Sequence, residues 1–145
     1  MLKSFWFWTL IVFIAMQFFS LDIPAKLPIN KEQELQAPPK VMSILKRSCY
    51  DCHSSEVKAP WYYSVAPISW FIQVHVKNAR AVVNFSKWNS YSKEKQYKLL
   101  DRLPESLLIR MPMPSYLYMH KESTLTKEEK KILSKWAKRL KEKIK

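Results

Sequence analysis

Hydrophobic residues recur with a helical period along most of the chain beyond residue 40. Residues 41–48 place apolar or small side chains at positions i, i+3, i+4 and i+7, which predicts a short helix that runs directly into Cys49. A second periodic stretch, residues 68–88, predicts a longer helix. The apolar positions of this stretch are Phe71, Val74, Ala79, Val82, Val83 and Phe85.

Two further helices are predicted in the C-terminal third. Ser92 can N-cap the first of them, and Pro104 is expected to end or kink it. Thr126-Lys127-Glu128-Glu129 has the form of a capping box, which opens a last helix toward the end of the chain. The inward positions of the two helices are Tyr97, Leu100, Leu103 and Leu107, then Ile132, Leu133, Trp136, Ala137, Leu140 and Ile144. The pattern predicts an all-α domain over residues 41–145.

Residues 1–21 are mostly apolar and carry one charge, at Lys3. The uncharged run from Phe5 to Leu21 would extend about 25 Å as a helix, at the short end for a membrane span. Trp6 and Trp8 lie near its start, where aromatic residues favour the membrane interface. We expect an uncleaved N-terminal signal anchor, with the following domain outside the cytoplasm. A cleaved signal peptide is the alternative.

Residues 22–40 are polar and contain four prolines, so we expect a tether between the anchor and the helical domain. The predicted organisation is therefore an anchor over 1–21, a Pro-rich tether over 22–40 and a single domain over 41–145.

The formal net charge of +13 implies a partner of opposite charge. We expect no nucleic-acid partner, because no motif for DNA or RNA binding is present. The chain contains no glycine, which excludes Gly-rich phosphate loops and makes nucleotide-dependent chemistry an unfavoured class.

The chemistry of the chain is concentrated in Cys49-Tyr50-Asp51-Cys52-His53, which holds both cysteines of the protein. The pattern C-x-x-C-H is typical of covalent c-type haem attachment. In such a site both thiols form thioethers with the haem vinyl groups, and the adjacent imidazole is an axial iron ligand. The spacing suits one turn of helix.

Three other interpretations of these residues stay open on the motif alone. A disulfide would use both cysteines but leave His53 without a role. A thiol redox pair would need a βαβ context that the pattern does not predict. A zinc site could use Cys49, Cys52, His75 and His120, although their spacing is unlike that of a zinc finger.

Residues 107–120 contain two Met-Pro pairs, which offer a second iron ligand. A thioether sulfur suits low-spin haem iron, and the following proline holds the loop extended. Met111 and Met113 are both candidates. His75 is a weaker one, since a histidine on a helix is more often simply packed. Arg80 could reach a haem propionate, although a solvent-exposed arginine is the simpler expectation. We expect a backbone carbonyl, of Pro60 or Pro67, to orient His53.

Several separate motifs resemble the bacterial membrane-anchored haem-binding domain family, whose members are similar to small monohaem cytochromes c. The motifs are C-x-D-C-H-S at 49–54, the run WYYSVAPISW at 61–70, NFSKW at 84–88 and the Met-Pro loop followed by a histidine at 111–120. They agree in order and spacing over roughly residues 40–140. The resemblance implies a small cytochrome c-like fold around one covalent haem c.

By this resemblance Cys49 and Cys52 carry the thioethers, His53 is the proximal ligand and Met111 is the distal ligand, with Met113 as the alternative. Ile109 and Arg110 replace the glycine and acidic residue that the family usually has before that methionine. We expect an electron carrier rather than an enzyme, which docks an acidic redox partner and contacts the membrane through its anchor. The resemblance to a bacterial family implies a single-pass anchor in the inner membrane with the domain in the periplasm, or a soluble periplasmic protein if the segment is cleaved. A five-coordinate haem that senses or binds a small ligand, or acts as a weak peroxidase, is the alternative function.

Overall fold

The structure, a computed structural model, describes residues 2–19, 21 and 26–144. The α-helices are α1 (Leu2–Met16), α2 (Pro39–Ser48), α3 (Tyr50–His53), α4 (Ile68–Val82), α5 (Lys93–Ile109), α6 (Pro114–Met119) and α7 (Lys127–Ile144). The 3₁₀-helices are η1 (Lys31–Gln33), η2 (Trp61–Ser64), η3 (Phe85–Ser90) and η4 (Lys121–Ser123). Within the described residues the one extended pairing is an isolated bridge between Lys26 and Glu56. The predicted all-α fold is confirmed.

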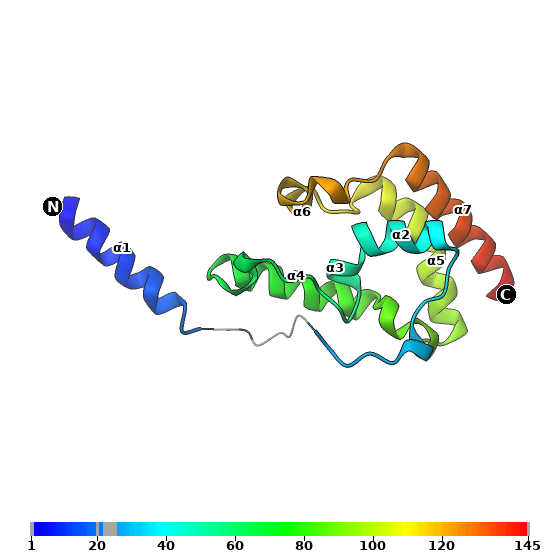
Figure 1. Cartoon of the computed structure of the whole chain (residues 1–145), viewed down its shortest axis with the longest axis horizontal. Coiled ribbons are helices and arrows are strands. Elements are labelled where there is room, and N and C mark those ends of the chain that lie inside the picture. Colours follow the sequence, from blue (N-terminus) through cyan, green and yellow to red (C-terminus); the bar gives the residue numbers. More distant parts are fainter. Residues whose placement is uncertain (1, 20, 22–25, 145) are drawn as a thin grey trace.

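The main core lies where α2, α5 and α7 pack together (Figure 1). Leu45, Leu107 and Leu133 are almost fully buried there. The predicted caps are present: Ser92 Oγ accepts from the Lys95 N–H at 3.3 Å, and the side chains of Thr126 and Glu129 each accept from the other's N–H at 3.1 and 2.9 Å. We call α2, α5 and α7 the helical body.

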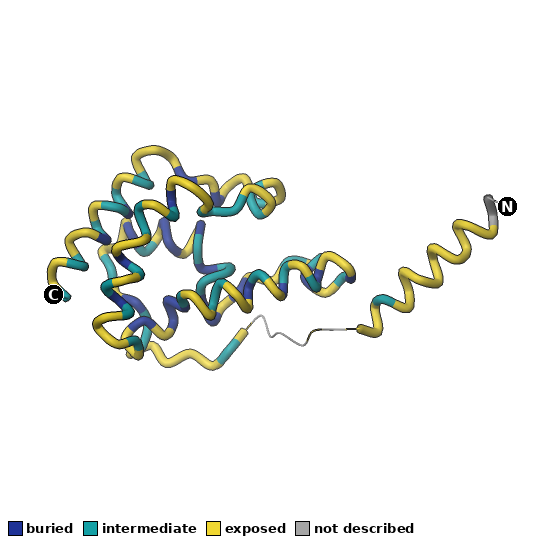
Figure 2. Tube along the Cα trace, turned by 180° about the vertical axis from the view of Figure 1, so that it is seen from behind, coloured by how far each residue is buried: buried dark blue, intermediate teal, exposed yellow. Residues whose placement is uncertain are grey.

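Two arms extend from the helical body in the same direction (Figure 2). One arm consists of η2 and α4, and the other consists of α6 with the loop before it. The first arm has a small core of its own, formed by Val57, Tyr63 and Val76 with Ile72 packed against it. The short helix α3 lies between the arms and joins the body to α4 (Figure 1).

Two helix boundaries differ from the sequence prediction. The helix predicted over 68–88 ends at Val82, because Val83 is extended and Asn84 opens η3 by accepting from the Ser86 N–H. Pro104 does not end α5, which continues for five further residues to Ile109. Leu100 and Leu107, on either side of Pro104, are both buried in the main core. Their burial offsets the cost of a proline inside a helix.

The predicted membrane anchor is wrong. Helix α1 has 15 residues and ends at Met16, so it extends only about 22 Å, against about 30 Å for the hydrocarbon core. The Gln17 side chain instead bonds the Ala66 backbone, donating to its carbonyl at 3.2 Å and accepting from its N–H at 3.0 Å. No helix among the described residues is long and apolar enough to cross a membrane. The predicted single-pass location in the inner membrane, and the membrane contact that depended on it, are withdrawn.

The segment predicted as a tether makes defined contacts where it is described. Leu27 N–H donates to the Ser55 carbonyl and Leu35 N–H to the Phe85 carbonyl, each at 2.9 Å. Leu35 is only 1 % exposed and belongs to the main core. Residues 1 and 20 of the predicted anchor and 22–25 of the predicted tether lie outside the described residues. The domain boundaries stay a prediction.

Candidate haem cleft

The C-x-x-C-H pentapeptide forms a single turn at the junction of α2 and α3. Cys49 ends α2, donating to the Leu45 carbonyl at 2.8 Å, and its own carbonyl accepts from the N–H groups of Cys52 at 3.2 Å and His53 at 2.9 Å. The apolar face of α2 is buried in the helical body, and this packing fixes the position of Cys49 at the start of the turn. The predicted helical turn is confirmed.

Two backbone carbonyls at the end of α4 hold the His53 ring. His53 Nδ1 lies 3.2 Å from the Ala79 oxygen and 3.1 Å from the Val83 oxygen. Carbonyl oxygens only accept, so Nδ1 carries the hydrogen and Nε2 keeps the lone pair that coordinates a metal. Burial lowers the pKa of His53 despite the opposing effect of the two carbonyls, which favours the neutral, ligating form.

The orienting carbonyls are not the expected ones. The Pro60 carbonyl accepts from the Tyr63 N–H and the Pro67 carbonyl from the Trp70 N–H, inside their own turns. Ala79 and Val83 take this role at the C-terminal end of α4, where the Ala79 carbonyl also accepts from the Val83 N–H at 2.9 Å and the Val83 backbone is extended.

Cys49 and Cys52 are both free thiols. Burial, with a smaller contribution from Cys52, raises the pKa of Cys49 to about 12. Burial, reinforced by Asp51, raises the pKa of Cys52 to about 11. A thiol redox pair needs a lowered pKa and electropositive surroundings, so these protonated thiols in an all-α fold do not suit one.

One cavity brings together the two cysteines, the histidine and the two methionines that the resemblance assigns to the haem. It has a volume of about 330 Å³ and is lined by Cys49, Cys52, His53, Met111 and Met113. Its walls are mainly apolar and come from α4, η3, α5 and α7. The wall residues include Ala79, Val82, Val83, Phe85, Trp88, Leu99, Leu100, Leu103, Leu107 and Trp136. An apolar cleft of this size with a few convergent ligating groups is a typical cofactor site.

The zinc alternative is not supported by the geometry. Among the described residues, no group of three or more histidine, cysteine or acidic side chains is close enough to hold a metal ion. His75 Nδ1 donates to the Phe71 carbonyl of its own helix at 2.9 Å, and His120 bonds Tyr62 at 2.6 Å. Arg80 Nε donates to the Ser54 carbonyl at 2.8 Å, which fixes it against the residue that follows His53.

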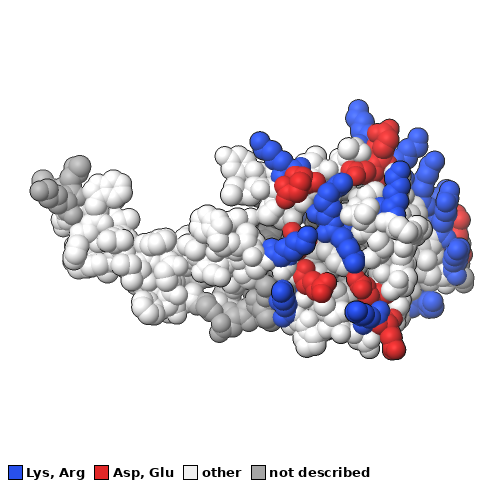
Figure 3. All heavy atoms as spheres, in the orientation of Figure 1, with Lys and Arg blue, Asp and Glu red and all other residues white. Residues whose placement is uncertain are grey.

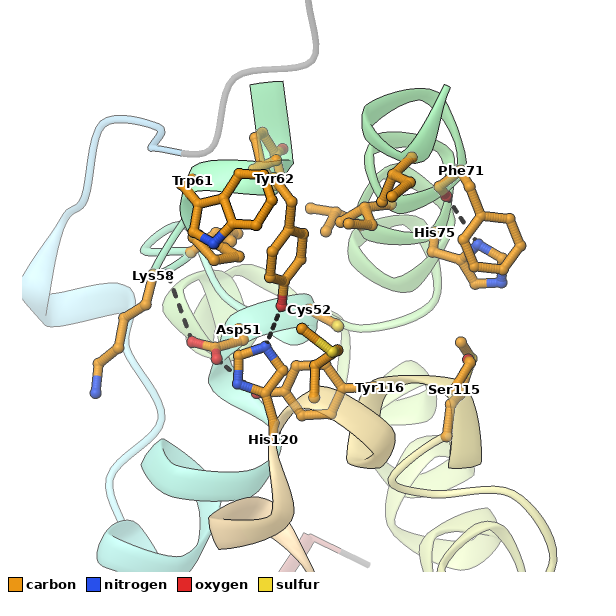
Figure 4. Close-up of a pocket in the computed structure, with 18 residues that line it drawn as sticks. Asp51, Cys52, Lys58, Trp61, Tyr62, Phe71, His75, Ser115, Tyr116 and His120 are labelled. Carbon is orange, nitrogen blue, oxygen red and sulfur yellow. Dashed lines mark hydrogen bonds between the residues drawn. The ribbon is translucent and has the colours of Figure 1, made fainter. Parts of the chain in front are cut away.

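The structure adds a polar contact that the sequence analysis missed. Tyr116, on α6, donates to Asp51 Oδ2 at 2.6 Å (Figure 4). Asp51 lies between the two cysteines, and its Oδ1 accepts from the Lys58 N–H at 3.4 Å. Met113 precedes α6, and its carbonyl accepts from the Tyr116 N–H at 3.0 Å. This contact ties the C-x-x-C-H turn (residues 49–53, called the attachment turn below) to the loop that holds Met111 and Met113 (the methionine loop). The signal in the sequence was the acidic residue inside C-x-D-C-H.

The comparison with known protein families is decisive for the class of protein. The model of a family described as a haem-binding domain matches residues 11–139. The chain belongs to this haem-binding domain family. No curated protein and no solved structure matches the chain.

The residues of this haem-binding domain fit the group that the family binds. The His53 ring presents one nitrogen for coordination, with the other held by carbonyls. Two free thiols and two thioethers line the same apolar cavity. Imidazole nitrogen and thioether sulfur are ligands of haem iron. Thiols form the covalent bonds to the haem vinyl groups.

Proposed function

We propose that this haem-binding domain carries one covalently attached haem c and transfers single electrons. The observation that carries the proposal is the cavity lined by Cys49, Cys52, His53, Met111 and Met113. Family membership supports haem as the cofactor, and the C-x-x-C-H turn supports its covalent attachment. When bound, the haem supplies a reversible one-electron iron couple.

Cys49 and Cys52 would hold the haem covalently, and His53 would hold the iron. The carbonyls of Ala79 and Val83 fix the tautomer of His53 and increase its basicity as a ligand. The mainly apolar walls of the cavity exclude water, which favours a low-dielectric site and tunes the redox potential.

Met111 is the proposed distal ligand. It lines only the cavity that also contains His53, whereas Met113 lies on the wall shared with a second cavity. The Met111 N–H donates to the Ser106 carbonyl at 2.9 Å, which ties the loop to the end of α5. His53 and Met111 would together hold the iron, and no position on the metal would then remain for a substrate.

The charge distribution favours an acidic protein as the electron acceptor. Lys and Arg side chains gather on the helical body (Figure 3). Between residues 127 and 145 there are nine Lys or Arg and three Glu. Such a surface supports fast, weak, salt-sensitive docking.

The test replaces Met111 and Met113 separately by alanine in haem-loaded protein. We expect only Met111→Ala to remove the weak methionine-to-ferric-iron absorption band and to allow rapid carbon monoxide binding by the reduced protein. Met113→Ala is the matched control, because it removes a neighbouring thioether from the same loop. Rapid carbon monoxide binding by the unmodified protein would overturn the electron-transfer proposal and favour a five-coordinate ligand-binding protein.

A further inference from the structure

A second cavity adjoins the haem cleft. It has a volume of about 360 Å³ and opens between η2–α4 on one side and α6 on the other (Figure 4). Cys52, His75 and Met113 line both cavities, so the two share a wall. Cys49, His53 and Met111 line only the first cavity. The proposed iron ligands therefore lie on one side of the shared wall, and the second cavity faces the edge of the site beside Cys52.

Aromatic and apolar side chains form most of the second cavity. Trp61 and Phe71 line it from the first arm, and Tyr116 and Met119 line it from α6. Trp61, Phe71 and Met119 are 78, 56 and 58 % exposed, although all three are large hydrophobic residues. Exposed apolar residues around a concave site mark a place where an apolar ligand binds. The opposed aromatic walls suit a planar ring.

A hydrogen-bonded chain leads from this cavity to solvent. Tyr62 and His120 both line the cavity, and the Tyr62 hydroxyl lies 2.6 Å from His120 Nε2 (Figure 4). His120 Nδ1 lies 3.2 Å from Glu122 Oε1, and the Glu122 side chain is 66 % exposed. An ionised carboxylate only accepts, so Nδ1 carries the hydrogen and Nε2 accepts from Tyr62.

In this hydrogen-bonded chain each group donates to the next one, from Tyr62 at the cavity to Glu122 at the surface. A phenol oxygen that donates to His120 still has lone pairs that can accept a hydrogen bond. A ligand hydroxyl that donates to Tyr62 is thereby connected through His120 to Glu122. The Tyr116 ring stacks on His120, with ring centroids 4.4 Å apart and planes at 15°, and holds the imidazole in place. The cavity thus combines a site for a planar apolar ring with a path for a proton.

We propose that this cavity binds an apolar, alkyl-substituted hydroquinone as the electron donor of the protein. The inference rests on the proposed electron-transfer function and supplies the donor that it needs. The hydroquinone loses two electrons and two protons, and its two C–O single bonds become the C=O bonds of the quinone. The electrons reduce two ferric haem proteins, one electron each, in successive encounters. The protons leave through Tyr62, His120 and Glu122.

The first experiment measures binding rather than electron transfer. Duroquinol, a tetramethyl hydroquinone, is titrated without oxygen into haem-loaded protein that has first been reduced to the ferrous state, and binding is followed by isothermal calorimetry. We expect saturable binding with one site per chain. Absence of binding up to the solubility limit of duroquinol would overturn the inference and indicate that the haem itself fills the second cavity.

The second experiment compares two tyrosine variants. Tyr62→Phe keeps the ring and removes the hydroxyl at the cavity. Tyr118→Phe makes the same change on α6 at a side chain that is 81 % exposed and does not line the cavity. We expect Tyr62→Phe to weaken duroquinol binding about tenfold, the effect of the hydrogen bond that a duroquinol hydroxyl donates to the Tyr62 oxygen, and Tyr118→Phe to leave it unchanged. Equal binding by both variants would overturn the placement of the ligand.

A kinetic measurement separates the proton path from simple packing. Stopped-flow reduction of the ferric protein by duroquinol should show a solvent deuterium isotope effect, and His120→Gln should slow this reduction at least tenfold. Reduction by hexaammineruthenium(II), which carries no proton, should be the same in all variants and serves as the control. If the ruthenium reductant reduces the ferric protein and duroquinol does not, the proposed hydroquinone site is wrong, but the proposed electron-transfer function is retained. If neither reduces the protein, the proposed function fails first.

Discussion

The helical body and the two arms are stabilised in different ways. The body buries a continuous apolar core in which Leu45, Leu133 and Ala137 have no exposed surface. The first arm has a core of three buried residues and exposes Trp61, Ile68 and Phe71. Polar contacts join the arms to the attachment turn and to each other, through Asp51–Tyr116 and Tyr62–His120. Hydrophobic burial is therefore concentrated in the body, whereas the arms are held by polar contacts and, by our proposal, by a haem between them.

Leu133→Ala should give the largest loss of stability, because it opens a cavity in the middle of the body. We expect the free energy of unfolding to fall by about 3 kcal/mol, within the range for buried leucine truncations. Denaturant unfolding followed by circular dichroism measures it. A loss below about 1 kcal/mol would show that the body is not the stable part of the molecule.

Val76→Ala tests whether the first arm opens independently. Val76 is 1 % exposed but packs in the small core with Val57 and Tyr63. We expect faster amide hydrogen exchange across α4 and unchanged exchange in α7, because local opening does not require the body to unfold. Uniformly faster exchange in both helices would contradict the division into body and arms.

Tyr116→Phe tests the contact that ties α6 to the attachment turn. The ring and its stacking on His120 remain, but Asp51 loses a charge-assisted hydrogen bond worth about 1–2 kcal/mol. In haem-loaded protein we expect a weaker methionine–iron absorption band and faster carbon monoxide binding. Tyr118→Phe on the same helix is the control. An unchanged band in Tyr116→Phe would show that Asp51 does not position the methionine loop.

Glu129→Gln should have the smallest effect and one that depends on pH. Partial burial alone would raise the pKa of Glu129, but hydrogen bonds from the Thr126 N–H and the Arg47 guanidinium outweigh it and hold the pKa below its usual value. The stabilisation is therefore present above the unfolded pKa of about 4.3 and is lost as the pH falls through the lower folded pKa.

We expect a stability difference of about 1 kcal/mol between unmodified protein and Glu129→Gln at pH 7, which disappears at pH 3. Urea unfolding at the two pH values measures it, and the exposed neighbour Glu128→Gln is the control. The same difference at both pH values would contradict the assigned role of the carboxylate.

Local signals in the sequence were sufficient for the body and for the attachment turn. The Ser92 cap, the Thr126–Glu129 capping box and the C-x-x-C-H spacing each depend on residues within a few positions of one another, and all were confirmed as structure. The roles of the two cysteines, His53 and Met111 as haem contacts stay proposals. The membrane anchor was mispredicted because hydropathy alone did not show that the helix ends at Met16.

Contacts between distant segments were beyond sequence reasoning. The carbonyls that orient His53 lie 26 and 30 residues away, at the end of α4, which comes before the predicted position. Asp51 and Tyr116 are 65 residues apart, and Tyr62 and His120 are 58 apart. Periodicity predicts which face of a helix is buried, but not which side chains from two arms meet across a cleft.

The most direct test of the central claim is the alkaline pyridine absorption spectrum of full-length protein produced together with haem-attachment machinery, with the intact mass measured in parallel. The account predicts a spectrum of haem joined by two thioethers and a mass increased by one haem. The Cys49→Ala Cys52→Ala double variant should carry no covalent haem. Unmodified protein that purifies folded, without covalent haem by either measurement, would contradict the account.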